Sequence, residues 1–118
     1  MYSILVVEDN DPNYILVEEI LSDYKIELTR AIDGKSFYSI INERKDFDLI
    51  LMDLMLPDTD GVELTKHVLH NHIKIPIIFI SAYTERCEEI FDLGIDYFIS
   101  KPVSEELFLS ILKKYIDI

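Results

Sequence analysis

The chain has 118 residues, of which 49% are hydrophobic, and a formal net charge of −12 at pH 7. This length and this hydrophobic content predict a single folded domain over residues 1–118 and exclude a disordered chain. No apolar run approaches the roughly 20 residues that a membrane-spanning helix needs. The negative charge argues against direct binding of nucleic acid, which requires a basic surface, and against binding to anionic membranes.

The chain begins with a short apolar segment over residues 3–7, which is bounded by polar residues and is typical of a buried strand. No basic region precedes it, so the N-terminus does not resemble a signal peptide. A helix is predicted over residues 12–22, with Asp11 as the N-cap and Pro12 as the first helical residue. The single cysteine, Cys87, cannot form an internal disulfide, which fits a reducing, cytoplasmic setting.

The rest of the chain alternates between short strands and helices. Further strands are predicted over residues 27–31, 48–53, 76–80 and 97–99, and further helices over 37–44, 62–70, 84–93 and after Ser104. The strand at 27–31 alternates in polarity and is expected to be more exposed than the others. Apolar positions expected to face the core include Leu16, Leu69 and Leu107. Five strand–helix units predict an α/β fold with a doubly wound parallel sheet.

Polar residues follow the buried strands at their carboxyl ends. The first strand ends in Glu8 and Asp9, the third in Asp53, the fourth in Ser81 and the fifth in Lys101. Because parallel strands point the same way, these residues share one edge of the sheet, where ligands bind in open α/β folds. In the flavodoxin-like strand order 2-1-3-4-5, the first and third strands are neighbours, which would bring the three carboxylates together.

This combination of residues indicates phosphoryl chemistry. Three close carboxylates repel one another unless cations intervene. Lys101 supplies one cation, and the hard oxygen ligands favour Mg²⁺, or Mn²⁺, as the other. A carboxylate beside a divalent cation, a lysine and a hydroxyl can act as a nucleophile toward phosphorus. Asp53 is the candidate nucleophile, although Asp is also common in turns; the Ser81 hydroxyl and the Ala82 backbone N–H could bind phosphoryl oxygens.

In this order, the residues resemble the receiver domain of two-component response regulators. The resemblance covers the whole chain and rests on Glu8-Asp9, on Asp53 within the segment 51–61, on Ser81-Ala82 and on Lys101-Pro102. It implies a flavodoxin-like (βα)5 fold in which Asp53 accepts a phosphoryl group from the phosphohistidine of a sensor histidine kinase or a histidine phosphotransfer domain. Such a chain is a signalling domain rather than an enzyme. Glu8-Asp9-Asn10 with Asn13 resembles the receivers of hybrid sensor kinases.

The resemblance also implies roles for individual residues. Glu8, Asp9, Asp53 and the backbone carbonyl of Met55 would hold Mg²⁺. Ser81, Ala82 and Lys101 would contact the phosphoryl group, Ser81 and Phe98 would form the conformational switch, and the Lys101-Pro102 bond would be cis. The segment 81–101 is slightly shorter than is usual in the family, which predicts a trimmed fourth helix. Because that helix is acidic, we expect a monomer that dimerises at most weakly on activation.

Two alternative functions remain open. A phosphohydrolase with an aspartyl nucleophile resembles the end of the third strand, but it carries a second acid two residues after the nucleophile, where this chain has Met55. A pseudo-receiver would bind proteins without being phosphorylated. The presence of all the polar groups argues against the pseudo-receiver, and a Mg²⁺-dependent phosphorylation test would distinguish it.

Overall fold

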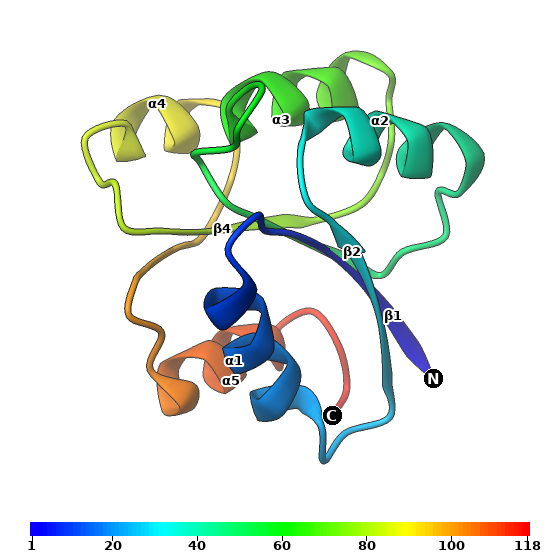
Figure 1. Cartoon of the computed structure of the whole chain (residues 1–118), viewed down its shortest axis with the longest axis vertical. Coiled ribbons are helices and arrows are strands. Elements are labelled where there is room, and N and C mark those ends of the chain that lie inside the picture. The colour runs from blue at the N-terminus through cyan, green and yellow to red at the C-terminus, as the bar shows by residue number, and fades with distance from the viewer.

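The computed structural model describes residues 1–118 and contains one parallel sheet between two layers of helices (Figure 1). Its strands are β1 (Tyr2–Val7), β2 (Ile26–Ala31), β3 (Leu49–Met52), β4 (Ile77–Ser81) and β5 (Phe98–Ser100). Its helices are α1 (Asp11–Leu21), α2 (Gly34–Glu43), α3 (Gly61–His70), α4 (Cys87–Asp92) and α5 (Glu105–Leu112). All strand pairs are parallel, and the order β2-β1-β3-β4-β5 confirms the predicted flavodoxin-like topology.

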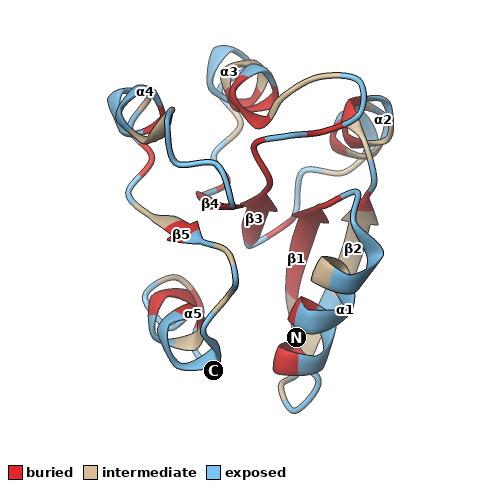
Figure 2. Ribbon diagram, turned by 60° about the vertical axis from the view of Figure 1, so that its left-hand side comes forward, coloured by how far each residue is buried: buried red, intermediate tan, exposed pale blue.

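Helices α1 and α5 cover one face of the sheet, and α2, α3 and α4 cover the other (Figures 1 and 2). Each face has its own core, with 18 buried hydrophobic residues on the three-helix side and 14 on the α1–α5 side. The central strands β1, β3 and β4 are buried almost throughout because helices cover both of their faces. Strand β2 lies at an edge and is mostly half-buried, as its alternating sequence predicts. None of the helices is long and apolar enough to cross a bilayer.

The helix starts are set by side-chain caps. The N-cap of α1 is Asn10, whose side chain accepts a hydrogen bond from the backbone N–H of Asn13 at 3.0 Å. The prediction of Asp11 as the cap was therefore wrong by one residue, because Asp11 already has helical geometry. Helix α5 is capped by Ser104, as predicted. Asp33 forms a capping box at the start of α2, so that helix begins three residues earlier than expected.

The apolar pattern predicted where the helices lie, but it predicted less well which residues at the edge of each apolar stripe are buried. Leu16, Leu69 and Leu107 were expected to face the core, but their exposed fractions are 37%, 41% and 50%. In α5, Ile111 and Leu112 are buried as the apolar pattern predicts, but Phe108 rather than Leu107 completes the buried face. Residues at the margin of an apolar stripe can face either the core or the solvent, and packing decides between them. Helix α4 has only six residues, which agrees with the predicted shortening.

Candidate functional site

The carboxyl edge of the sheet brings the predicted polar residues together. Glu8 directly follows β1 and Asp53 directly follows β3, and the backbone N–H of Asp53 donates to the carbonyl of Val7 at 3.1 Å. The N–H of Lys101 donates to the carbonyl of Ser81 at 3.0 Å, so the ladder between β4 and β5 extends to the lysine. The hydrogen bonds of the sheet therefore fix the backbone from which each side chain projects.

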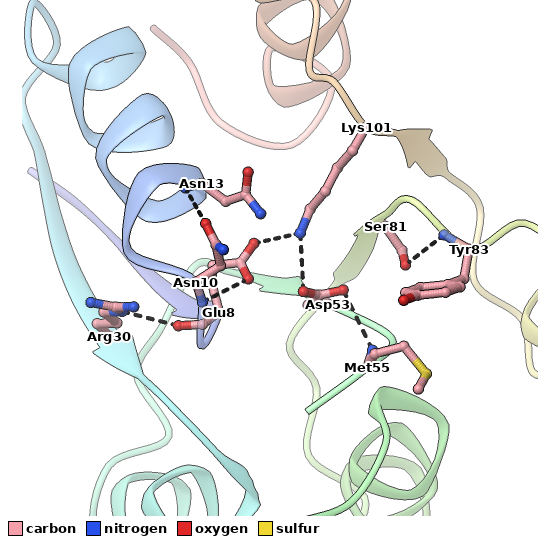
Figure 3. A network of polar contacts seen from close by, with 9 residues as sticks. All are labelled: Glu8, Asn10, Asn13, Arg30, Asp53, Met55, Ser81, Tyr83 and Lys101. Carbon is pink, nitrogen blue, oxygen red and sulfur yellow. Dashed lines mark hydrogen bonds and ion pairs between the residues drawn. The ribbon is translucent and has the colours of Figure 1, made fainter. Parts of the chain in front are cut away.

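Lys101 joins two of the carboxylates in a largely buried network (Figure 3). Its Nζ donates to Glu8 Oε1 at 2.7 Å and to Asp53 Oδ2 at 3.0 Å, and none of the three side chains is more than 14% exposed. Asp9 is exposed and makes no hydrogen bond or ion pair. One oxygen from each of Glu8, Asp9 and Asp53 lies within 4.8 Å of the other two. When ionised, these three acids and one lysine carry a net charge of −2.

Burial opposes ionisation in this network. It raises the pKa of Glu8 from 4.5 to about 7; the ion pair with Lys101 counteracts the rise and the neighbouring Asp53 adds to it. Burial also works against the charged form of Lys101, but its bonds to Glu8 and Asp53 outweigh that effect and raise its pKa. The lysine therefore stays charged, whereas Glu8 ionises only against a desolvation cost that an additional cation would offset.

The oxygens around this cluster fit a hard divalent cation. Asp9 has both carboxylate oxygens available. Glu8 Oε2 receives only a 3.3 Å bond from the N–H of Asn10, and Asp53 Oδ1 only a 3.4 Å bond from the N–H of Met55. Magnesium binds such oxygens and keeps several water ligands, so it does not need a complete protein cage. The donor set and its excess negative charge both suit one Mg²⁺ ion.

The loop after β4 borders the same site. Ser81 is fully buried, and its Oγ accepts a hydrogen bond from the N–H of Tyr83 at 3.1 Å, which leaves the hydroxyl proton free to be donated. Ala82 and Tyr83 line the cleft of about 280 Å³ that Asp53 and Lys101 also line. Figure 3 shows Ser81 and Tyr83 on the side of Asp53 away from Glu8. Tyr83 was not predicted as a site residue, and its place two residues after Ser81 was the only available signal.

The switch candidate Phe98 lies on β5, two residues before the sheet edge. Its half-buried ring stacks on Phe79 of β4, with 6.3 Å between the ring centroids and 5° between the planes. The aromatic ring is therefore packed beside the strand that ends in Ser81. The Lys101-Pro102 peptide bond is cis, as predicted.

Gly61 shapes the turn that follows Asp53. Its N–H donates to the carbonyl of Leu54 at 2.7 Å, which brings the start of α3 against the end of β3. A Cβ atom at this position would collide with the backbone oxygen of Asp53 and crowd the side chains of Met52 and Phe79. Only glycine permits this approach of two backbone segments.

Comparisons with known proteins agree with this geometry. The family model described as "Response regulator receiver domain" matches residues 4–113. The polar-differentiation response regulator DivK of Brucella anthropi is 32% identical over 118 residues, which cover 97% of this chain and 95% of DivK. The uncharacterized transcriptional regulatory protein YrkP of Bacillus subtilis is 36% identical over 107 residues, which cover 89% of this chain and 45% of YrkP. This chain thus spans less than half of YrkP.

Solved structures show the same fold. The receiver domain of the sensor histidine kinase PA1611 from Pseudomonas aeruginosa superposes with a TM-score of 0.84 and 28% sequence identity, covering 97% of this chain and 96% of that one. That structure has a magnesium ion coordinated in its active site cleft. The non-phosphorylated HemR receiver domain from Leptospira biflexa has a TM-score of 0.86 and 28% identity, over 100% of this chain and 96% of that chain.

Proposed function

This chain belongs to the response regulator receiver domain family of two-component signal transduction, and we propose that it acts as one receiver domain over residues 1–118 whose phosphoacceptor is Asp53. The observation that carries the proposal is the cluster of Glu8, Asp9 and Asp53, with Lys101 bonded to two of these carboxylates. An excess of acids in a largely buried position lowers the stability of the fold, because a buried charge that is not fully compensated is costly. The arrangement is understandable as a site for a cation and a phosphoryl group.

The proposed donor is a phosphohistidine on a sensor histidine kinase or on a histidine phosphotransfer domain. A carboxylate oxygen of Asp53 forms a bond to phosphorus while the bond between phosphorus and the imidazole nitrogen breaks, and the electron pair of that bond stays on the imidazole. The bonds from Lys101 and from the Met55 N–H orient the carboxylate before the donor arrives. Lys101 and the free hydroxyl proton of Ser81 are within the site to bind phosphoryl oxygens, together with the N–H of Ala82.

Magnesium is the proposed cofactor, and Mn²⁺ would suit the same oxygens. Glu8, Asp9, Asp53 and the backbone carbonyl of Met55 would hold it. When bound, the metal neutralises charge on the transferring phosphoryl group. Two uncompensated negative charges in the cluster support this assignment, and so does the magnesium ion in the receiver domain of PA1611.

The proposed docking surface for the donor lies beside the site, on α1 and the start of α5. Ile15 and Leu107 are 47% and 50% exposed there. A cavity of about 60 Å³ lined by Leu16 and Val103 also reaches Lys101, so apolar surface is continuous with the phosphoacceptor cleft. An exposed apolar surface next to a reactive group favours a transient protein partner.

Ser81 and Phe98 are the proposed switch residues, and the α4 side is the proposed responding surface. That surface is poorly suited to strong self-association, because α4 has six residues and carries Glu88 and Glu89 in its first turn. Arg86, the nearby cation, is already paired with Asp60 at 3.0 Å and with Glu89 at 2.7 Å. We therefore expect a monomer that dimerises at most weakly with beryllofluoride, as measured by sedimentation; a tight dimer through α4 would contradict this part of the proposal.

Intact mass spectrometry after incubation with acetyl phosphate tests the phosphoacceptor. Wild type should gain one phosphoryl group when Mg²⁺ is present and none in EDTA, and Asp53→Ala should gain none in either buffer. Asp58→Asn is the matched control, since Asp58 lies in the same loop but binds the N–H groups of Gly34 and Lys35 instead.

The Asp58→Asn variant should be labelled like wild type. Equal labelling of Asp53→Ala and wild type would refute the site. A wild-type chain that takes up no phosphoryl group, from acetyl phosphate or from a phosphorylated histidine phosphotransfer domain, would favour the pseudo-receiver alternative.

A further inference from the structure

Arg30 contacts the loop that carries Glu8 and Asp9 from the side away from Lys101 (Figure 3). It lies on β2, and its Nε donates to the backbone carbonyl of Glu8 at 3.0 Å. Its Nη1 forms an ion pair with Asp11 at 2.8 Å, and its guanidinium lies over the ring of Tyr14 at 4.7 Å. The side chain is 22% exposed, so much of it is packed between β2 and the start of α1.

These contacts hold the loop at two points. The Glu8 carbonyl lies on one side of Asp9, and the Asp11 carboxylate lies on the other. Asp9 itself has no hydrogen bond or ion pair, so the position of its carboxylate depends on the backbone that carries it. A planar guanidinium can bind both anchors at once in a fixed relative geometry, which a single ammonium group cannot do.

We propose that Arg30 is a positioning residue for Mg²⁺: by fixing the backbone on both sides of Asp9, it keeps the Asp9 carboxylate beside those of Glu8 and Asp53. This inference rests on the proposed function, because it assumes that the carboxylate cluster binds the metal. Arg30 contacts neither the carboxylates that would bind the metal nor the reacting atoms. Partners that orient metal ligands typically change metal affinity by about 10- to 100-fold when they are removed.

The sign of the effect separates positioning from simple electrostatics. Arg30 is a positive charge beside a cation site, so its removal would strengthen Mg²⁺ binding if only Coulomb repulsion mattered. If its role is to position Asp9, removal should weaken binding, because the ligand would have to be ordered when the metal binds. A tighter site and a weaker site are opposite outcomes of one substitution.

Isothermal titration with MgCl₂ on the full chain, at constant ionic strength, provides the test. The variants are Arg30→Met, Arg30→Lys and the control Arg44→Met. Arg44 is a close match because it too spans several groups, with an ion pair to Glu27 at 2.9 Å, a bond to the Ser3 hydroxyl at 2.8 Å and a stack on Phe47 at 4.5 Å, but it lies at the other end of the sheet.

We expect Arg30→Met to raise the Kd for Mg²⁺ by about tenfold. Arg44→Met should keep the wild-type Kd, and Arg30→Lys should fall between wild type and Arg30→Met because an ammonium group can keep one of the two anchors. Unchanged or tighter binding by Arg30→Met would overturn the inference, as would equal weakening in Arg44→Met.

If Arg30→Met does not fold, Arg30→Lys decides the question, and a wild-type Kd in that variant would overturn the role of the guanidinium. Failure of the wild type itself to bind Mg²⁺ would refute the proposed cofactor and, with it, this inference. Binding by the wild type together with an unaffected Arg30→Met would refute only the role of Arg30.

Discussion

The amino ends and the carboxyl ends of the parallel strands form two edges of the sheet, and similar charged residues lie at both. At the amino edge, Arg44 pairs with Glu27 and Asp46, and Asp48 accepts a hydrogen bond from the backbone N–H of Ser3 at 2.8 Å. The three acids are exposed and Arg44 is half-buried, and each acid has a partner. Hydrogen bonds raise the pKa of Arg44 and lower that of Asp46, so the charged forms are favoured.

The carboxyl edge has as many acids per cation, but two of its acids are buried. Lys101 pairs with Glu8 and Asp53 but not with Asp9, and burial raises the pKa of Glu8 to about 7. The exposed acids of the amino edge are therefore stabilised by water, whereas ionised Glu8 at the carboxyl edge bears a desolvation cost that a bound cation would offset. Burial of the acids, rather than their number, therefore distinguishes a candidate binding site from a structural network.

The largest expected effect comes from removing the cation of the carboxyl edge. Lys101→Met should lower the free energy of unfolding by about 3 kcal/mol in EDTA at pH 7.5, because it leaves two buried carboxylates without their partner. Urea unfolding measures it. Lys66→Met is the control, since Lys66 is 43% exposed and lies 3.7 Å from Glu63, and it should lose less than about 0.5 kcal/mol. Equal losses would break the contrast between the edges.

A pH titration of stability should isolate Glu8. Its pKa is about 7 in the fold against 4.5 for the ordinary group, so between these values the folded chain holds a proton that the unfolded chain has released. Stability should therefore fall as pH rises from about 4.5 to 7 and then level off, by about 2 kcal/mol relative to Glu8→Gln in EDTA. Saturating Mg²⁺ should abolish this fall. A wild-type stability curve parallel to that of Glu8→Gln would show that folding does not raise the pKa of Glu8.

Neutralising one acid at each edge should give changes of opposite sign. Asp53→Asn should raise the free energy of unfolding in EDTA by about 1 kcal/mol, because it removes a charge that repels Glu8. Asp48→Asn should lower it by about 1 kcal/mol, because it weakens the bond to the Ser3 N–H. Thermal or urea unfolding of both variants measures the difference. Destabilisation by both would mean that the Lys101–Asp53 pair outweighs the repulsion.

The smallest expected effect concerns the amino edge. Arg44→Met should lower the free energy of unfolding less than Lys101→Met or Asp48→Asn, because its ion pairs are largely exposed and screened by solvent. The loss should shrink further in 0.5 M salt. A salt-independent loss as large as that of Lys101→Met would show that the amino edge is also a buried charge network.

Much of the site was predictable because it depends on position along a strand. Glu8, Asp53, Ser81 and Lys101 each end an apolar run, and parallel strands necessarily bring such ends to one edge. The strand limits were equally visible, since β3 and β4 are short apolar segments. The start of α1 was off by one residue because Asn10 and Asp11 are both good caps, and the sequence does not rank them.

The sequence by itself therefore determined the alternation of strands and helices, the two-sided burial of the sheet and the collection of acids and a lysine at its carboxyl edge. Only the tertiary structure decided that Lys101 bonds to Glu8 and Asp53 together, that Arg30 holds the loop around Asp9, and that Phe108 rather than Leu107 enters the core. The physical reason is that periodicity acts between neighbours in the chain. These contacts join residues 19 to 93 positions apart, or depend on how a helix rotates against the sheet, and packing alone sets both.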